Sequence, residues 1–411
     1  MRLSVTISEA PQVEAPPRPW VPFVTGALVF TLLFGALSGA FDLWRLRVAL
    51  SPVPVDHHRG HALGQLFGFV WLFTMGLSLH LGPRFFNAPL PGAGRLRVLK
   101  WLSLGGVVLA LAGRFGALLP GSAVFGPVGA VLVLAAATNW LELVLTWNRE
   151  PGPRDGMHRF VVAGTAWWWV AALSFVVWQL GQAAGGPLAS VPMEAVWAPA
   201  LFGGASWVWG VFLRAGLCTL QLARPTPKWQ RAWFVTWQVA VGAATVGAWV
   251  GPTLDPLVHL AFVVAVVVLA LALRPHRADG SSPQARAVRW GLWCVGAFGV
   301  MHLWALLPLP QPALLGDATR HAFSLGAMTS FLFGFGGRMV PGFSGVRLAR
   351  PRAYEVGLLG VQAAVVLRLC ELSTSKLALS LSAASGGLAV LGVGLVAFAL
   401  LTTVRRVPAL A

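Results

Sequence analysis

Residues 61–82 read HALGQLFGFVWLFTMGLSLHLG and contain no Asp, Glu, Lys or Arg. A helix needs about 20 mostly apolar residues to cross the hydrocarbon core of a bilayer, and this stretch is long enough. The rest of the chain has a similar composition: of 411 residues, 57% are hydrophobic and only 10% are charged. An average soluble protein is about 25% charged. The sequence therefore predicts an all-α, polytopic membrane protein.

Outward from this stretch, apolar segments recur along the whole chain. Twelve of them are long enough to be spans: 22–42, 61–82, 98–119, 123–147, 159–181, 197–222, 233–250, 257–273, 288–308, 318–337, 354–373 and 382–404. We expect residues 1–20 to form a polar, Pro-rich cytoplasmic tail and residues 21–405 to form one membrane domain, a bundle of about twelve helices.

Basic residues are distributed asymmetrically between alternate connections. With the N-terminus inside, the inner loops 83–97, 148–158, 223–232, 274–287 and 338–353 are rich in Arg, whereas the outer loops after the first carry one basic residue, Lys376. This is the positive-inside pattern, although the first outer loop, 43–60, departs from it. It predicts a multi-pass protein of a bacterial inner membrane with both termini cytoplasmic. It also explains most of the net charge of +17 by topology, which argues against nucleic acid as a partner.

Six of the nine histidines fall at one expected level, near the outer face. They are His57, His58, His61, His259, His302 and His321. We expect His57 and His58 to be solvated loop residues, and His80, His158 and His276 to lie at the inner side. After His61, Gly64 and Gly68 continue one helix face that can admit a flat macrocycle, although helix packing is the favoured interpretation of such a stripe.

Four arginines share that outer level against the positive-inside rule: Arg59, Arg114, Arg320 and Arg368. A buried Arg costs at least ~2.5 kcal/mol at a helix centre, so the group calls for anionic partners. Ion pairing with Asp42, Asp56, Asp255, Asp317 and Glu371 is the simpler interpretation. A haem would satisfy the arginines with its propionates and the histidines with its iron. Neutral imidazole is also a good copper ligand. At the inner side, we expect Glu142 to pair with Arg214.

Three stretches carry a resemblance to a known family. HALGQLFGFVWLFTMGLSLHLGPRF (61–85) is similar to helix 2 of haem–copper oxidase and nitric-oxide-reductase catalytic subunits and of the NnrS family. RHAFSLGAMTSFLFGFGGRMVPGFSGVRL (320–348) resembles NnrS more specifically, and LALAGRFGALL (109–119) is similar to an NnrS stretch with a buried Arg. The family usually has a histidine where this chain has Phe343, and an acidic residue where it has Ala62.

The resemblance implies a membrane protein with haem b, and with copper as a second metal, involved in nitric oxide binding, metabolism or nitrosative stress. His61 and His321 then look like haem ligands, and Arg114 and Arg338 match family arginines. Arg59, Arg114, Arg320 and Arg368 would neutralise the propionates, and His259 and His302 are candidates to hold copper. An electron donor is implied if the protein turns over its ligand, and whether it is an enzyme stays open.

Oxygen reduction is not expected, because the chain has one tyrosine, Tyr354, and lacks the paired histidines of an oxidase copper site. The main alternative is a twelve-helix secondary transporter of a small anion, gated by the outer Arg and His residues. A noncatalytic assembly subunit is a third interpretation.

Overall fold

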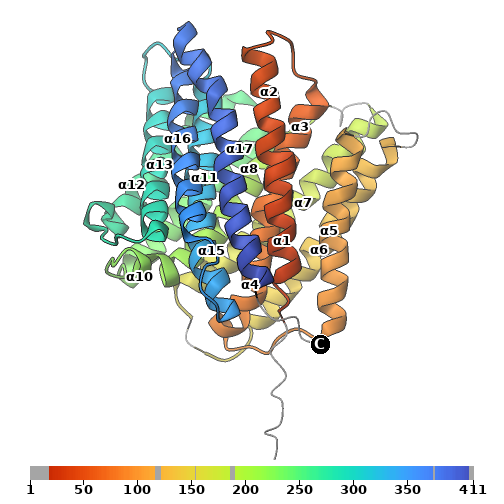
Figure 1. Cartoon of the computed structure of the whole chain (residues 1–411), viewed down its shortest axis with the longest axis vertical. Helices are drawn as coiled ribbons and strands as arrows, with labels where there is room; N and C mark the ends of the chain where they lie inside the picture. The colour runs from red at the N-terminus through yellow and green to blue at the C-terminus, as the bar shows by residue number, and fades with distance from the viewer. Residues whose placement is uncertain (1–17, 116–121, 153, 186–189, 374, 407–411) are drawn as a thin grey trace, which may run out of the picture.

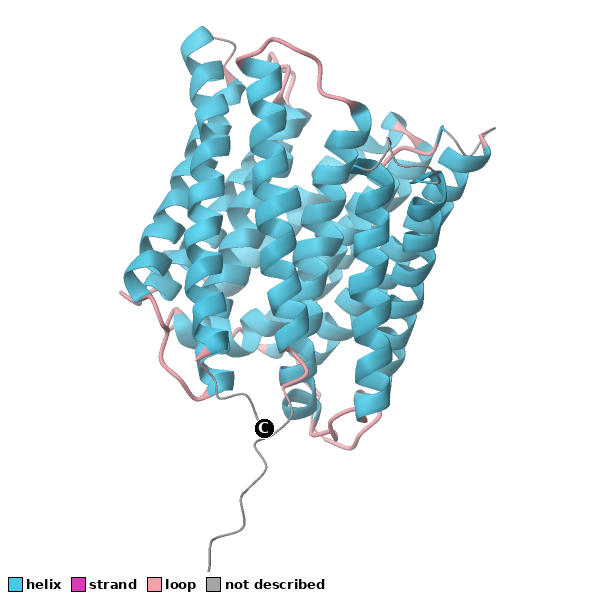
Figure 2. Cartoon of the chain, turned by 45° about the vertical axis from the view of Figure 1, so that its right-hand side comes forward, coloured by secondary structure: helices cyan, strands magenta, loops and turns pink. Residues whose placement is uncertain are grey.

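The computed structural model describes residues 18–115, 122–152, 154–185, 190–373 and 375–406. This part of the chain is helical and contains no strand. Its helices run roughly along one axis and are joined by short loops (Figures 1 and 2). The expected all-α bundle is confirmed. Most of the expected tail lies outside the described residues.

Among the described residues, half of the twelve long helical stretches are built from several consecutive α, π and 3₁₀ segments. In chain order the segments are α1 Val21–Phe30, η1 Thr31–Leu37, α2 Ser38–Arg47, α3 Val55–Leu63, η2 Gly64–Trp71, α4 Leu72–Phe86, α5 Ala93–Phe115, α6 Ser122–Trp147, α7 Gly156–Ala184, α8 Glu194–Ala198, η4 Pro199–Gly203, α9 Gly204–Val211, η5 Phe212–Gly216, α10 Leu217–Thr219, α11 Pro227–Val250, η6 Pro252–Leu254, α12 Asp255–Leu273, η7 Pro275–Arg277, α13 Pro283–Leu306, α14 Leu315–His321, η8 Ala322–Met328, α15 Thr329–Ser344, α16 Pro351–Leu369, η9 Cys370–Leu372 and α17 Lys376–Arg405.

Ten helical stretches in the described part are long and apolar enough to cross a membrane. The other two expected spans, 288–308 and 318–337, are also helical and correspond to α13 and to the continuous stretch α14–η8–α15. The short turn η6 separates α11 from α12, as expected. The chain enters α1 and leaves α17 at the same end of the bundle (Figure 1).

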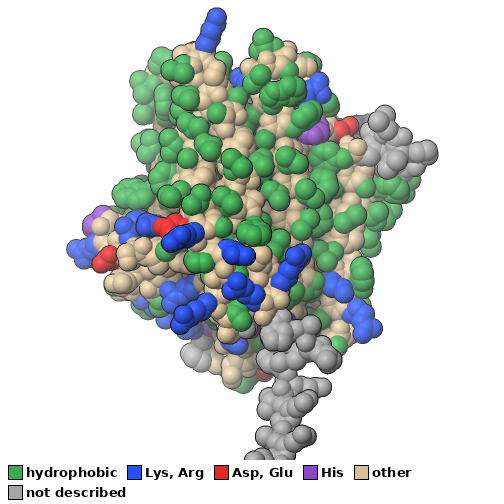
Figure 3. Space-filling view, in the orientation of Figure 1, with side chains coloured by type: hydrophobic (Ala, Val, Ile, Leu, Met, Phe, Trp, Pro, Cys, Tyr) green, Lys and Arg blue, Asp and Glu red, His purple; other side chains and the backbone are tan. Residues whose placement is uncertain are grey.

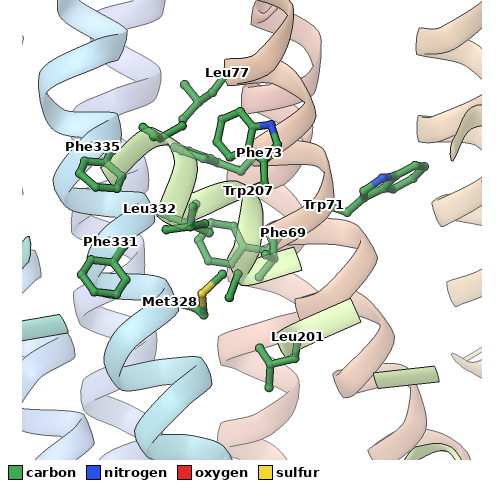
Figure 4. Packing of buried hydrophobic residues seen from close by; sticks show 14 of the residues in the cluster. Phe69, Trp71, Phe73, Leu77, Leu201, Trp207, Met328, Phe331, Leu332 and Phe335 are labelled. Atoms are coloured by element: carbon green, nitrogen blue, oxygen red, sulfur yellow. The ribbon is translucent and has the colours of Figure 1, made fainter. Parts of the chain in front are cut away.

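Two spans lie at the centre of the bundle. The apolar window of Val55–Phe86 is 89% buried and that of Glu194–Thr219 is 94% buried, against 28–50% for the other eight. The α15 helix joins them through aromatic contacts: the rings of Phe69 and Phe333 lie 5.5 Å apart, and those of Trp209 and Phe331 lie 5.3 Å apart. Figure 4 labels Phe69, Trp207 and Phe331, one residue from each of these three elements. Tilted and edge-on aromatic pairs of this kind stabilise a core beyond their buried area.

Each of these three central elements contains π-helical turns. They are η2 in the first, η4 and η5 in the second, and η8 in the third. A π turn adds one residue to a helical turn, and such turns are frequent at functional sites. Two of them follow histidines, since η2 begins three residues after His61 and η8 begins directly after His321.

Figure 3 shows how charge is arranged on one face. Lys and Arg side chains gather around the lower end, whereas the sides above it are mostly hydrophobic. We call this lower end, where α4 and α15 end and α7, α11 and α13 begin, the basic end; the segments there include Arg154, Arg224, Arg286 and Arg347. The opposite end is the histidine end. The hydrophobic sides are what a bilayer would cover.

Helices α5 and α6 approach closely through glycines. A Cβ on Gly106 would lie 2.9 Å from the backbone nitrogen of Val133 and 3.0 Å from its Cγ2 atom. The neighbouring Gly105 faces open space, with nothing within 4 Å of such a Cβ. Small residues at helix contacts let membrane helices pack backbone to backbone.

We predict that Gly106→Val destabilises the protein by about 1–3 kcal/mol, because backbone atoms must move to accept the side chain. Gly105→Val is the matched control and should leave stability nearly unchanged. The melting temperature of the detergent-solubilised protein measures both. An equal loss in the two variants would contradict the close α5–α6 contact.

Candidate histidine and arginine site

His61 is fixed by the first helix of the chain. Its ring lies 2.9 Å through Nδ1 from the carbonyl oxygen of Gly35. The backbone of Gly39 makes room for the ring, because a Cβ there would lie 2.7 Å from Cε1 of His61. A neutral imidazole that donates Nδ1–H to a carbonyl leaves Nε2 as a free acceptor. Among the described residues, Nε2 of His61 has no hydrogen-bond partner.

His321 is held in the same way by its own helix. It ends α14, and its Nδ1 lies 2.9 Å from the carbonyl oxygen of Asp317 and 3.5 Å from the Oδ2 atom of that residue. Within the described part its Nε2 is also unpartnered, and the side chain keeps 26% of its surface accessible. His321 and Arg368 lie within electrostatic range of His61. The two expected haem ligands therefore lie within electrostatic range of each other.

Arg368 organises the acidic residues around His321. It pairs with Asp317 of α14 and lies 3.2 Å from Glu371 and from the hydroxyl oxygen of Ser382. Its side chain is 8% exposed and that of Glu371 is 0% exposed. Arg320 adds a second guanidinium, 3.3 Å from Asp317. The two arginines therefore already have carboxylate partners, which is the simpler interpretation of their position.

The same carboxylates form a candidate metal group. Asp317, His321 and Glu371 each offer one ligand atom, and these atoms lie within 4.8 Å of one another. Arg368 contacts both carboxylates, so a cation bound here would have to displace its guanidinium. The arrangement therefore favours an ion-pair network over a metal site at this position.

Arg59 of α3 and Arg114 of α5 form a separate cluster against residues of α7. Both guanidinium groups lie over the ring of Trp178, at 5.2 Å and 4.5 Å from its centroid. Arg114 donates to Asp56 at 2.8 Å and to Gln179 at 2.6 Å. Arg59 donates to Gln182 at 3.1 Å and lies 3.9 Å from Asp56. One carboxylate is therefore shared between two cations.

The first outer loop is shorter than expected, because α3 already begins at Val55. The expectation that His57 and His58 are loop residues is wrong. His57 lies in α3 and its Nδ1 is 2.5 Å from the carboxylate of Asp42, which is buried on α2; His58 is 3.9 Å from the same group. A carboxylate buried on a neighbouring helix needs such a partner.

His259 and His302 form a pair. Their Nδ1 atoms lie 2.7 Å apart, so one ring donates a proton and the other accepts it. Nε2 of His302 is buried without a partner. The rings of Phe298 and Phe262 lie 4.4 Å and 4.9 Å from that of His302. Two imidazoles thus share one proton inside an aromatic enclosure.

The glycine stripe after His61 is filled by protein. A Cβ on Gly60, Gly64 or Gly68 would lie within 2.6–2.8 Å of Phe115, Phe34 or Phe30 respectively. The favoured interpretation, helix packing, therefore holds for this face.

Tyr354 has a structural role. Its hydroxyl donates a hydrogen bond to the carbonyl oxygen of Phe333 at 2.7 Å.

The expected pairing of Glu142 with Arg214 is wrong. Glu142 lies 3.5 Å from Arg95, and Arg214 lies 3.5 Å from Asp155. Burial favours the neutral carboxyl of Asp155, but hydrogen bonds with His158 and Arg224 and the charge of Arg214 outweigh it. The pKa of Asp155 is therefore held well below its ordinary value.

The other inner residues have local partners. His158 contacts the carbonyl oxygen of Phe85 at 3.0 Å, and Arg338 donates to the hydroxyl of Thr219 at 3.2 Å. His80 stacks on Phe343, with ring centroids 3.7 Å apart.

The amide and tryptophan partners of the arginines, Trp178, Gln179 and Gln182, are not among the residues expected from the sequence. A signal for them is present, since VVWQLGQ places two glutamines in an otherwise apolar span. Gly35 and Gly39 are also unexpected, because nothing local marks them as neighbours of His61.

The fold defines the protein as a polytopic helical membrane protein, with paired histidines and paired arginines at one end of the bundle. No protein-family model and no curated protein matches the chain.

We predict that Arg368→Met destabilises the protein by about 3–5 kcal/mol, because removing one member of a buried ion network leaves uncompensated charge. The triple change Arg368→Met, Asp317→Asn, Glu371→Gln should recover much of this loss, since it removes the buried carboxylates as well. Thermal unfolding in detergent measures each variant, with the exposed Arg352→Met as control. A stability of Arg368→Met equal to that of the control would show that the network is not important.

Proposed function

We propose that this chain is a membrane haem protein of NnrS type, whose haem is held at the histidine end and binds nitric oxide. One observation carries the proposal: His61 and His321, which lie within electrostatic range of each other, each have Nδ1 on a backbone carbonyl and Nε2 unpartnered among the described residues. Histidines that bind metals commonly have their second nitrogen fixed in this way, which sets the tautomer and the ring orientation.

The residues around the pair fit a haem in part. One or both of the two imidazoles would hold the iron of a haem through Nε2. The glycine face after His61 is occupied by Phe30 and Phe34, so a macrocycle would not lie there. Arg320 and Arg368 already hold Asp317, so haem propionates would have to replace or share that carboxylate.

When bound, a haem would supply an iron that changes oxidation state and binds diatomic ligands. Groups of the chain itself would orient the histidines that hold this haem. The carbonyl oxygens of Gly35 and Asp317 orient the rings, and Gly39 admits the His61 ring. The arginines at the histidine end stabilise negative charge, because the surroundings are apolar and screen charge weakly.

Copper at His259 and His302 is the second part of the proposal. Nitrogen ligands lie about 2.0 Å from ions of this size, which places two nitrogens of one site roughly 3 Å apart. The Nδ1 atoms of the pair are 2.7 Å apart, so small ring movements would let both bind one ion in place of the shared proton. The aromatic enclosure would then restrict access to that ion.

The first test is an optical spectrum of the full-length protein, purified in detergent after haem-replete expression. We expect a reduced-minus-oxidised spectrum of b-type that changes when nitric oxide is added. A b-type spectrum that ignores nitric oxide would support two axial histidines and exclude the ligand. A colourless protein would overturn the haem assignment.

Variants then test the ligands. His61→Ala and His321→Ala should each lower the haem content or convert the spectrum, because an axial ligand is lost. His276→Ala, at an exposed position of the basic end, is the control and should keep the spectrum. Full haem content with an unchanged spectrum in His61→Ala would remove that residue from the site.

A second candidate function is transport of a small anion. It is favoured by the cluster on Trp178, where Arg59 and Arg114 share one carboxylate and so keep an excess positive charge. Proteoliposomes should then take up a labelled anion, and Arg114→Ala should abolish uptake. Failure of every small anion tested would count against this function.

A further inference from the structure

A pocket of about 440 Å³ lies at the basic end, where α7 and α11 begin. Four arginines line it: Arg154, Arg159, Arg224 and Arg231. Among the described residues that line it, Asp155 is the one acidic residue. The pocket lies at the opposite end of the bundle from the paired histidines, so it is independent of the proposed haem site.

The charges in this pocket are not balanced. Asp155 is already paired with Arg224 and, at 3.5 Å, with Arg214. Within the described part, Arg159 and Arg231 have no carboxylate or hydrogen-bond partner, and Arg154 donates only to the carbonyl oxygen of Glu150 at 3.2 Å. Glu150 itself lines a separate pocket of about 170 Å³. The larger pocket therefore has three arginines without a counter-ion.

One long helix adds to this positive field. The first residues of α7 and α11, Gly156 and Pro227, both line the pocket, but Asp155 already caps α7, and the Gly156 N–H donates to Gln230 at 3.2 Å. The N-cap residue of α11, Thr226, makes no side-chain cap, so the first amides of that helix lack a side-chain acceptor. A helix N-terminus carries partial positive charge and free N–H groups that suit an anion. Arginine in turn binds phosphate in a two-pronged geometry.

The surface next to the pocket indicates whether a bound phosphate group would be free or part of a lipid. On α11, Arg231, Val235 and Val239 follow one another at four-residue spacing and so share one face of the helix. Arg231 lines the pocket, whereas Val235 and Val239 are half exposed. Trp229, on the first turn of the same helix, is also exposed, as is typical of tryptophans at the membrane interface. A phosphate group in the pocket could therefore belong to a molecule whose apolar chain lies along α11.

We propose that this pocket binds the phosphate headgroup of an anionic phospholipid, with an acyl chain lying on the exposed face of α11. Basic pockets between membrane helices bind such headgroups elsewhere. The lipid supplies the anion that the three unpaired arginines lack, and it anchors the connection between α10 and α11 to the membrane.

The test measures lipid binding to the full-length protein in detergent, by native mass spectrometry and by the shift in melting temperature. The probes are phosphatidylglycerol, phosphatidylcholine and inorganic phosphate. We expect phosphatidylglycerol to bind and stabilise the protein, and Arg159→Gln with Arg231→Gln to weaken its binding about tenfold or more, since charged hydrogen bonds to phosphate are lost. Arg347→Gln with Arg352→Gln removes the same charge from exposed positions of the basic end and should bind as the unchanged protein does.

Three results would overturn the proposal. They are equal weakening in both double variants, equal binding of phosphatidylcholine, and full competition by inorganic phosphate, which would indicate a site for a free anion. Circular dichroism and the melting temperature without lipid show whether each variant is folded. The single variant Arg231→Gln provides a milder change if the double variant is unstable, and unaltered binding by it would also count against the site.

Discussion

A guanidinium that cannot reach water must find its counter-ions inside the protein, and Arg368 meets this constraint with Asp317 and Glu371. The pairing joins α16 to α14, and α14 carries His321 as its last residue. The backbone carbonyl of Asp317, on the same helix, also fixes the His321 ring. The position of a candidate metal ligand therefore depends on an ion pair that the apolar surroundings make necessary.

A second consequence of the same constraint is the tautomer of the buried imidazoles. Backbone carbonyl oxygens accept from Nδ1 of both His61 and His321, which leaves Nε2 as the basic nitrogen of each ring. Apolar surroundings alone would favour neutral rings, but they would not choose between the two nitrogens. The carbonyls of Gly35 and Asp317 make that choice. This is why two histidines from distant parts of the chain keep the same nitrogen, Nε2, available.

The fold could be predicted from the sequence further than the site could. Apolar length and loop charge are local properties, so stretches such as 257–273 and the turn 251–256 were readable directly. Which arginine meets which carboxylate depends on how helices rotate about their axes, and depth along the membrane does not contain that information. Glu142 and Arg214 share a depth and still have other partners. His57 differs for another reason: the first turn of α3 is polar, and its composition does not distinguish it from a loop.

The π turns explain part of how the helices are rotated about their axes, which depth along the membrane does not determine. A residue added to one turn rotates every later side chain on that helix by about 100° relative to an uninterrupted α-helix. Because η2 and η8 follow His61 and His321, the histidines and the aromatic core below them belong to differently phased faces of the same helices. The core residues Phe69 and Phe333 can therefore pack against each other while the histidines above them keep free nitrogens. In an uninterrupted α-helix, the direction of the histidine would fix the direction of the aromatic residues below it. The π turns allow the two directions to be set separately.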